Sequence, residues 1–279
     1  MFAQGAGGNT SVKRGNRMYV KASGVFLKDL REGYGYACCD FGKIRGYIEK
    51  FSLSDSPSEL EFDAFLRSAL FPEETFGEPS IETGIHAVLD SAYVAHTHSV
   101  MANIFTCMKN GYRLLSRIFD PRSFAHVPYF NPGAQLSCGI ASLAKQGPLP
   151  PILFLKNHGL VVHGEDAETV VSQTLEVHRA IEKYLTENNA FEEFRVEREM
   201  ADFSSHLFPD SVVYSGIDPS QLAPDKRDVL FEISSAVRYV TKMIRRLGEE
   251  PRFISVADME RIRAMDKEKM RMRMIMKEV

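Results

Sequence analysis

Long apolar runs are missing from this sequence, and that absence narrows the class of protein. No uninterrupted apolar stretch approaches the roughly 20 residues that a membrane helix needs. The first residues, MFAQGAGGNTSVK, have neither the basic start nor the long apolar stretch of a secretory signal. We therefore expect no membrane as a partner.

Cysteines are few, and neither sign of charge is in large excess. The formal net charge is −3 over 279 residues, which gives no electrostatic reason to expect nucleic acid as a partner. The four cysteines lack CxxC spacing, and the adjacent Cys38 and Cys39 make a poor disulfide framework. This pattern predicts a protein of the reducing cytoplasm.

The apolar content of 44% is enough for one large domain, or for one domain plus an appendage. Alternating apolar residues and turn signals favour extended segments within 5–29, at 36–41, 44–50 and 92–98, and on both sides of a turn in 151–164. Apolar spacing of three and four residues favours helices near 59–70, 80–91 and 99–108, after residue 133, and over 167–185.

The character of the sequence changes near residue 195. Turn signals dominate residues 186–228, and two further helices are predicted over 229–247 and 255–276. We therefore predict a domain of residues 1–195 and a helical C-terminal extension of residues 196–279. The last helix is basic and rich in methionine, which suits contact with anionic lipid or RNA, or packing against the protein or another subunit; packing is the preferred interpretation.

Three histidines make a candidate metal site. His96 and His98 share one face of the strand expected at 92–98, because side chains alternate along a strand, and both rings can reach one cation at about 2.0–2.1 Å. On its own, this spacing also fits two ordinary hydrogen-bonded histidines. His158 stands in the turn KNHG between two apolar strands, where a polar ring is unexpected without a function. Three imidazoles leave room for substrate, as in catalytic rather than structural zinc sites.

A carboxylate and three short loops surround this candidate site in the sequence. Glu82, near the start of the helix expected at 80–91, is a candidate general acid or base, a further metal ligand, or a carboxylate that complements the helix N-terminus. The segments GGNTS and ASG, together with Ser80 at a helix start, offer N–H and hydroxyl groups to an anion. Each of these short segments also occurs as an ordinary turn.

The order of the motifs GGNTS, KASG, PSIETGIH, HTHS, NPG and LKNHGLVVHG resembles the class II aldolase/adducin family over roughly residues 5–190. The resemblance implies an α/β fold of three α/β/α layers around a central, mostly antiparallel sheet. It also implies a homotetramer and zinc, or another divalent cation such as Mn²⁺, Co²⁺ or Fe²⁺. The roles implied are metal ligands for His96, His98 and His158, the catalytic carboxylate for Glu82, and substrate or phosphate binding for Asn9, Ser11, Ser23, Gly24 and Ser80.

The favoured function is that of a metal-dependent aldolase of carbohydrate metabolism, a lyase that cleaves or forms a carbon–carbon bond in a sugar or sugar phosphate through a metal-stabilised enediolate. The alternatives are a dehydratase or decarboxylase at the same site, a sugar-phosphate epimerase, and a non-catalytic adducin-like scaffold. Family epimerases typically carry Asp at the position of Glu82, and adducin-like chains have lost metal ligands. One departure is Ile81, which replaces a serine of the sugar-phosphate aldolases and removes one hydroxyl from the phosphate site.

Overall fold

The computed structural model describes residues 1–201 and 205–276, and a seven-stranded sheet forms its centre. The strand order is β3-β2-β1-β4-β7-β6-β5, and neighbouring strands are antiparallel except for the parallel pair β5–β6. The strands are β1 (Asn9–Arg14), β2 (Arg17–Lys21), β3 (Tyr36–Asp40), β4 (Tyr93–Thr97), β5 (Phe124–Val127), β6 (Ile152–Leu155) and β7 (Gly159–Gly164). The prediction of a mostly antiparallel sheet is confirmed.

Side chains on β6 and β7 alternate between two apolar clusters on opposite faces of the sheet. Phe154 and Leu160 belong to one cluster, and Leu153 and Val161 belong to the other. All four side chains are buried, so helices cover both faces at this point of the sheet. The predicted three-layer arrangement is therefore confirmed.

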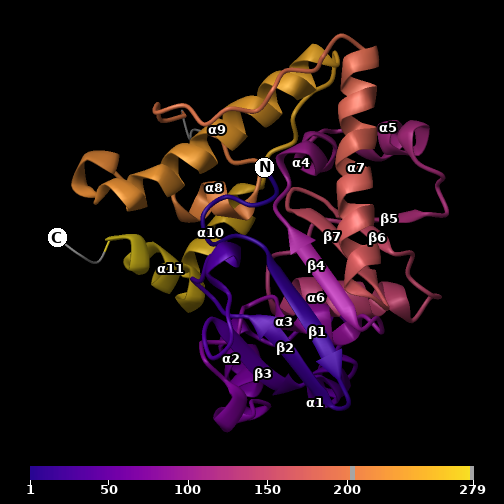
Figure 1. The fold of residues 1–279 in the computed structure, drawn as a ribbon, viewed down its shortest axis with the longest axis vertical. Coiled ribbons are helices and arrows are strands. Elements are labelled where there is room, and N and C mark those ends of the chain that lie inside the picture. The colour runs from indigo at the N-terminus through magenta and orange to yellow at the C-terminus, as the bar shows by residue number, and fades with distance from the viewer. Residues whose placement is uncertain (202–204, 277–279) are drawn as a thin grey trace.

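Different helices build the two outer layers (Figure 1). One apolar cluster includes residues of α1 (Phe41–Ile48), α2 (Glu59–Ser68), α3 (Thr83–Val88) and α6 (Ala134–Ala144). The other includes residues of α4 (Val100–Thr106), α5 (Gly111–Ile118) and α7 (Ala167–Glu187). Short 3-10 turns lie at η1 (Leu27–Asp29), η2 (Leu53–Asp55), η3 (Pro72–Glu74) and η4 (Pro219–Gln221).

The C-terminal extension is helical, as predicted, and it packs on the sheet domain. Its helices are α8 (Pro209–Val213), α9 (Pro224–Arg246), α10 (Val256–Ala264) and α11 (Asp266–Met276). Residues of α8, α9 and α10 share one apolar cluster with α4 and α7. Figure 1 shows these C-terminal helices to the left of α7, with α11 next to the N-terminal loop that leads into β1. The domain boundary at residue 195 stays a prediction.

The prediction of an extended segment at 44–50 is wrong, because most of this segment belongs to α1. The Asp40 carboxylate caps the helix by accepting a hydrogen bond from the Lys43 N–H at 2.9 Å. Ile44 and Ile48 are four residues apart and fully buried on one helical face. This spacing and the N-cap outweigh the β-branched residues and the glycines that had suggested a strand.

Two predicted helices have other bounds. The helix expected at 80–91 is the short α3, and Glu82 occupies its N-cap position rather than its first turn. The helix expected at 255–276 is two helices, because Met265 adopts an extended backbone between α10 and α11. The buried Met265 side chain lies at this break, between the end of α10 and the start of α11.

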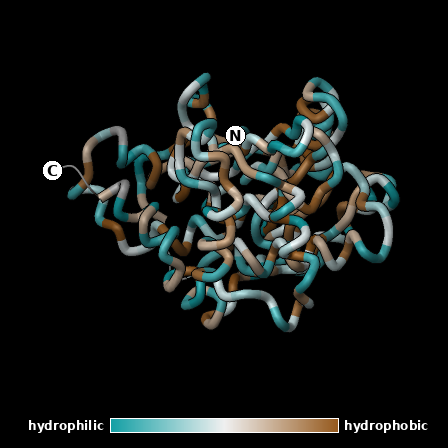
Figure 2. The backbone as a smooth tube through the Cα atoms, turned by 90° about the horizontal axis from the view of Figure 1, so that it is seen from below, coloured by the Kyte–Doolittle hydropathy of each residue, from teal (hydrophilic) through white to brown (hydrophobic). Residues whose placement is uncertain are grey.

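The helices within residues 1–201 and 205–276 include none that is long and apolar enough to span a membrane. Figure 2 shows polar and apolar residues interleaved along the backbone, in keeping with amphipathic elements that bury one face.

Candidate metal centre

The end of β4 and the turn between β6 and β7 bring the three histidines together. His96 lies on β4, which pairs with β7, and His98 follows directly after β4. His158 lies in the β6–β7 turn, where the preceding Asn157 has a φ of 52°. Gly159 allows the turn to approach β4, because a Cβ at this position would lie 2.3 Å from the Thr97 carbonyl oxygen.

Glu82 completes a buried cluster with the three histidines. Its Oε1 lies 2.8 Å from His158 Nε2 and 3.4 Å from His96 Nε2. One ligand atom from each of the four residues lies within 4.8 Å of the others, and all four residues are buried. This donor set of three imidazoles and one carboxylate suits a divalent cation such as zinc.

The hydrogen bonds of the Nδ1 atoms, the ring nitrogens of His96 and His98 that face away from the cluster, show how the cluster fits a cation. His96 Nδ1 donates to the Leu160 carbonyl oxygen at 3.1 Å, and His98 Nδ1 donates to Asp210 Oδ2 at 2.5 Å. A neutral imidazole that donates through Nδ1 has its lone pair on Nε2. The two Nε2 atoms are 3.1 Å apart, and a cation between the rings would satisfy both lone pairs. The residues present therefore fit a metal ion.

Burial and neighbouring charges set the protonation of these groups. Burial lowers the pKa of His158 to about 4, although Glu82 acts in the opposite direction, so this ring is neutral at pH 7. Burial raises the pKa of the Glu82 carboxyl, but His96 and His158 together lower it more, and the net pKa lies well below its usual range. A neutral imidazole and an ionised carboxylate are the forms that bind a metal.

A hydrogen-bond chain fixes Glu82. Asn9 Nδ2 donates to Glu82 Oε2 at 2.8 Å, and the Glu82 N–H donates to Ser80 Oγ at 3.2 Å. Asn9 Oδ1 pairs with His86 Nε2, whose other ring nitrogen lies 2.8 Å from Ser11 Oγ. Burial lowers the pKa of His86 to about 3, so this ring stays neutral and acts as a support of Asn9.

A polar cavity of about 30 Å³ adjoins the cluster. Of the residues expected to bind substrate or phosphate, Asn9, Ser23, Gly24 and Ser80 line this cavity. Ser11 does not line it, and its hydroxyl lies 2.8 Å from His86 Nδ1.

Four charged residues of this cavity escaped the sequence prediction: Lys21, Asp210, Glu268 and Arg271. Lys21 is buried, donates to the Val25 carbonyl oxygen at 2.7 Å, and has its pKa lowered by burial to about 8. The KASG motif and the segment Phe208-Pro209-Asp210 were available signals for Lys21 and Asp210. Glu268 and Arg271 stand in a run of alternating charges that gives no such signal.

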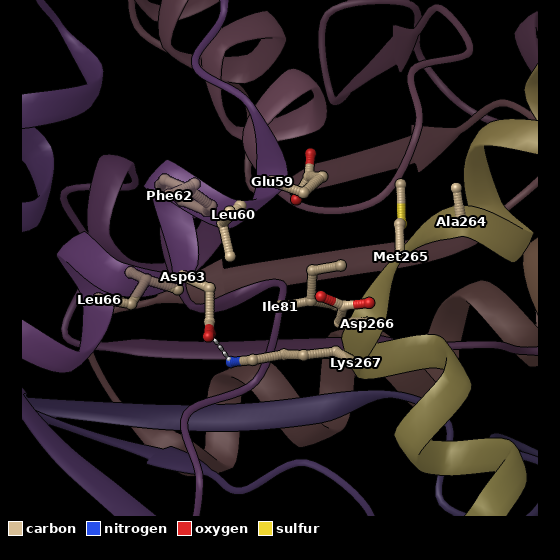
Figure 3. Close-up of a pocket in the computed structure, with 10 residues that line it drawn as sticks. All are labelled: Glu59, Leu60, Phe62, Asp63, Leu66, Ile81, Ala264, Met265, Asp266 and Lys267. Carbon is tan, nitrogen blue, oxygen red and sulfur yellow. Dashed lines mark ion pairs between the residues drawn. The ribbon is translucent and has the colours of Figure 1, made fainter.

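A second, larger cavity of about 150 Å³ lies between α2 and the junction of α10 and α11 (Figure 3). It is lined by the apolar side chains of Leu60 and Phe62 and by the ion pair of Asp63 Oδ1 with Lys267 Nζ at 2.6 Å. Ile81 lines both cavities. Among the described residues, the grouping of three or more possible metal ligands lies at the smaller cavity.

The fold and the site agree with one protein family. The chain belongs to the class II aldolase and adducin family, since the model of the class II aldolase and adducin N-terminal domain matches residues 1–185.

Individual relatives share parts of this chain. The uncharacterized oxidoreductase YuxG of Bacillus subtilis is 31% identical over 190 residues, which are 65% of this chain and 27% of YuxG. The chain thus spans about a quarter of that relative's length. The L-fuculose phosphate aldolase of Methanocaldococcus jannaschii is 25% identical over 174 residues, 59% of this chain and 76% of that protein.

A solved structure shows the same fold. The N-terminal class II aldolase domain of a conserved protein from Thermoplasma acidophilum superposes with a TM-score of 0.56 at 23% sequence identity. The match covers 64% of this chain and 84% of that chain.

Proposed function

We propose that this chain is a metal-dependent aldolase that cleaves or forms a carbon–carbon bond in a sugar or sugar phosphate. One observation carries the proposal: Glu82 Oε1 faces the imidazoles of His158 and His96 inside a buried cluster. A buried carboxylate beside three imidazoles combines a metal site with an acid–base group.

Each residue of the cluster has a defined role in this proposal. His96, His98 and His158 hold the cation, for which zinc is the first candidate. When bound, the cation supplies a Lewis acid that stabilises the negative charge developing on substrate oxygens. Glu82 moves a proton through Oε1, because Asn9 already occupies Oε2.

The polar cavity favours a phosphorylated substrate. Ser23 and Ser80 bring hydroxyl donors to the cavity, and Lys21 adds a positive charge at its wall. Asn9 also lines the cavity, with its amide N–H groups donated to Ser80 and Glu82. The similarity to an L-fuculose phosphate aldolase supports the same class of substrate. Ile81 removes one hydroxyl from this set, which weakens phosphate binding without abolishing it.

Three alternatives use the same fold. A dehydratase or decarboxylase would use the same metal centre on another substrate. The presence of Glu82, rather than Asp, disfavours an epimerase, and the complete ligand set disfavours an adducin-like scaffold.

In the favoured proposal the enzyme is a homotetramer of the cytoplasm, where the four buried cysteines stay as free thiols. Residues 1–195 form its catalytic domain and residues 196–279 an extension that contributes to the cavity.

The test is a screen of ketose phosphates, ketoses and 2-keto acids with zinc-loaded protein, in which aldehyde release is measured. Cleavage of a ketose phosphate that a chelator abolishes supports the proposal. Loss of water or of carbon dioxide, without carbon–carbon cleavage of any ketose, would replace it with the dehydratase or decarboxylase alternative.

A further inference from the structure

We infer that Asp210, in the C-terminal extension, is a positioning residue of the metal centre. Its carboxylate holds the His98 ring so that Nδ1 carries the proton and Nε2 faces the cation. The inference rests on the proposed function in one respect: it takes the three histidines as metal ligands.

The contact between Asp210 and His98 is short and shielded from water. Asp210 lies in the first turn of α8, its side chain is 0% exposed, and its Oδ2 is 2.5 Å from His98 Nδ1. The two residues are 112 positions apart in the sequence, so tertiary packing creates the contact. A metal-bound imidazole whose second nitrogen donates to a carboxylate has a fixed tautomer and a more basic ligand atom.

Asp210 is itself held in place by α11. Arg271 Nη2 donates to Asp210 Oδ1 at 2.8 Å, and Arg271 Nη1 donates to Glu268 Oε2 at 2.9 Å. One carboxylate oxygen of Asp210 therefore serves His98 and the other serves Arg271. The charge of Arg271 compensates the buried carboxylates, and its planar guanidinium fixes their direction.

The N-terminal loop leaves space for this contact. A Cβ built on Gly7 would lie 2.7 Å from His98 Nδ1 and 2.8 Å from Asp210 Oδ2, so any larger residue would push against both groups. Gly7 does not have a positive φ, and the requirement for glycine is therefore one of space. The first glycine of the GGN motif thus permits the contact between the sheet domain and the extension.

The consequence is a metal centre built from two parts of the chain. The sheet domain supplies the three imidazoles and Glu82, and the extension supplies Asp210 with its support from Arg271. His96 has a different arrangement, because its outer nitrogen donates to the backbone of β7. The extension therefore acts on the centre through His98.

The test compares the cation affinity of full-length variants by competition of Zn²⁺ with a chromophoric chelator. Asp210→Asn should weaken zinc binding by ~10–100-fold, the usual effect of removing such a partner of a ligand histidine. Asp266→Asn is the matched control on α11, because the Asp266 side chain is 82% exposed, and it should bind zinc as tightly as the wild type.

Arg271→Lys keeps the buried charge but loses the two-pronged contact, so it should show a smaller loss of zinc affinity in the same direction. Arg273→Lys, an exposed position on the same helix, is its control. The cobalt-loaded proteins give a second measurement: the visible absorption band should shift in Asp210→Asn and stay unchanged in both controls. Thermal unfolding of the metal-free proteins identifies any variant that fails to fold. If Asp210→Asn fails to fold, the zinc affinity of Arg271→Lys decides whether Asp210 positions His98.

Two failures are distinguishable. If the wild type binds no cation, the proposed function fails. If the wild type binds zinc and folded Asp210→Asn and Arg271→Lys bind it equally tightly with an unchanged cobalt spectrum, the role of Asp210 is refuted while the metal centre stands.

Discussion

The two cavities that meet at Ile81 differ in size and in chemistry. The larger one, of about 150 Å³, is lined by apolar side chains of α2 and of the α10–α11 junction and by the Asp63–Lys267 ion pair. The smaller one, of about 30 Å³, is lined by loop residues, by Glu82 and by two of the histidines, His98 and His158. In this molecule the convergence of buried ionisable groups marks the candidate site, and cavity volume does not.

The same helix closes both cavities. Lys267 of α11 faces the larger cavity, and Glu268 and Arg271 face the smaller one. The sugar phosphate of the proposed function needs more room than about 30 Å³, so in that proposal we expect the cavity beside the metal centre to widen when substrate binds. Movement of α11 would change the volumes of both cavities together, because residues of this helix line both.

The largest expected effect comes from removing a metal ligand. His98→Ala should lose the cation and the activity together, because two imidazoles remain and Asp210 loses its partner. Metal analysis of the purified variant is the measurement. His163→Ala is a matched control, since His163 is also buried but pairs with Ser91 and Pro150. Full metal content in His98→Ala would show that the ligand assignment is wrong.

The next effect separates catalysis from metal binding. Glu82→Gln should keep the cation but lower turnover by ~10²-fold or more, the usual scale for a general acid or base. Glu59→Gln, at the larger cavity, should leave turnover nearly unchanged. An unchanged rate in Glu82→Gln would show that Glu82 only complements the N-terminus of the helix. Loss of the metal in this variant would show that Glu82 is a metal ligand.

The three histidines, Glu82 and four of the five expected substrate-binding residues could be placed at one site from the sequence, because they stand in short, ordered motifs. The local pattern also predicted the long α7, whose cap is Asp166 and whose apolar residues recur on one face. It did not predict α5, which follows α4 after the short segment 107–110, nor the four-residue strand β5. In β5 the buried residues are the first and the last, Phe124 and Val127, so the strand lacks the alternation that marks a half-buried strand.

The extension was harder to predict, for a physical reason. Residues 186–228 contain several turn signals, which hid the short α8 and the first turn of α9. Arg271 is an ordinary charged residue in the sequence, and the segment Phe208-Pro209-Asp210 gives no hint of what Asp210 contacts. The role of Asp210 depends on its burial and on its contacts with His98 and Arg271. Such contacts between distant segments are decided by packing, which no local pattern reports.

A moderate effect is expected at the residue that both cavities share. Ile81→Ser should return a hydroxyl to the polar cavity and tighten the binding of phosphoglycolohydroxamate by about tenfold, since a hydrogen bond to a charged group contributes about 1.5 kcal/mol or more. Ile81→Ala is the control for the lost side-chain volume. Isothermal titration calorimetry gives the affinities. Equal affinities in the two variants would argue against a phosphate group at this position.

The smallest effect concerns the larger cavity and pH. Burial raises the pKa of Glu59 to about 7, above its unfolded value near 4.5. As pH rises, the unfolded chain loses the Glu59 proton at a lower pH than the folded protein does. The contribution of Glu59 to the free energy of unfolding therefore falls as pH rises from about 4.5 to 7. The loss should be about 2 kcal/mol, because one pKa unit corresponds to about 1.4 kcal/mol and Glu59 keeps some contact with solvent.

Glu59→Gln should remove this part of the pH dependence, which urea unfolding at several pH values can measure. Parallel stability profiles for the variant and the wild type would contradict the raised pKa.

Metal reconstitution tests the central claim most directly. The protein is stripped with a chelator and titrated with Zn²⁺ while cleavage of the best ketose phosphate is followed. We expect no cleavage without metal, and activity that rises linearly and stops rising at one equivalent of Zn²⁺ per chain. Full cleavage by the stripped protein, or no recovery after stoichiometric zinc has bound, would contradict the central claim.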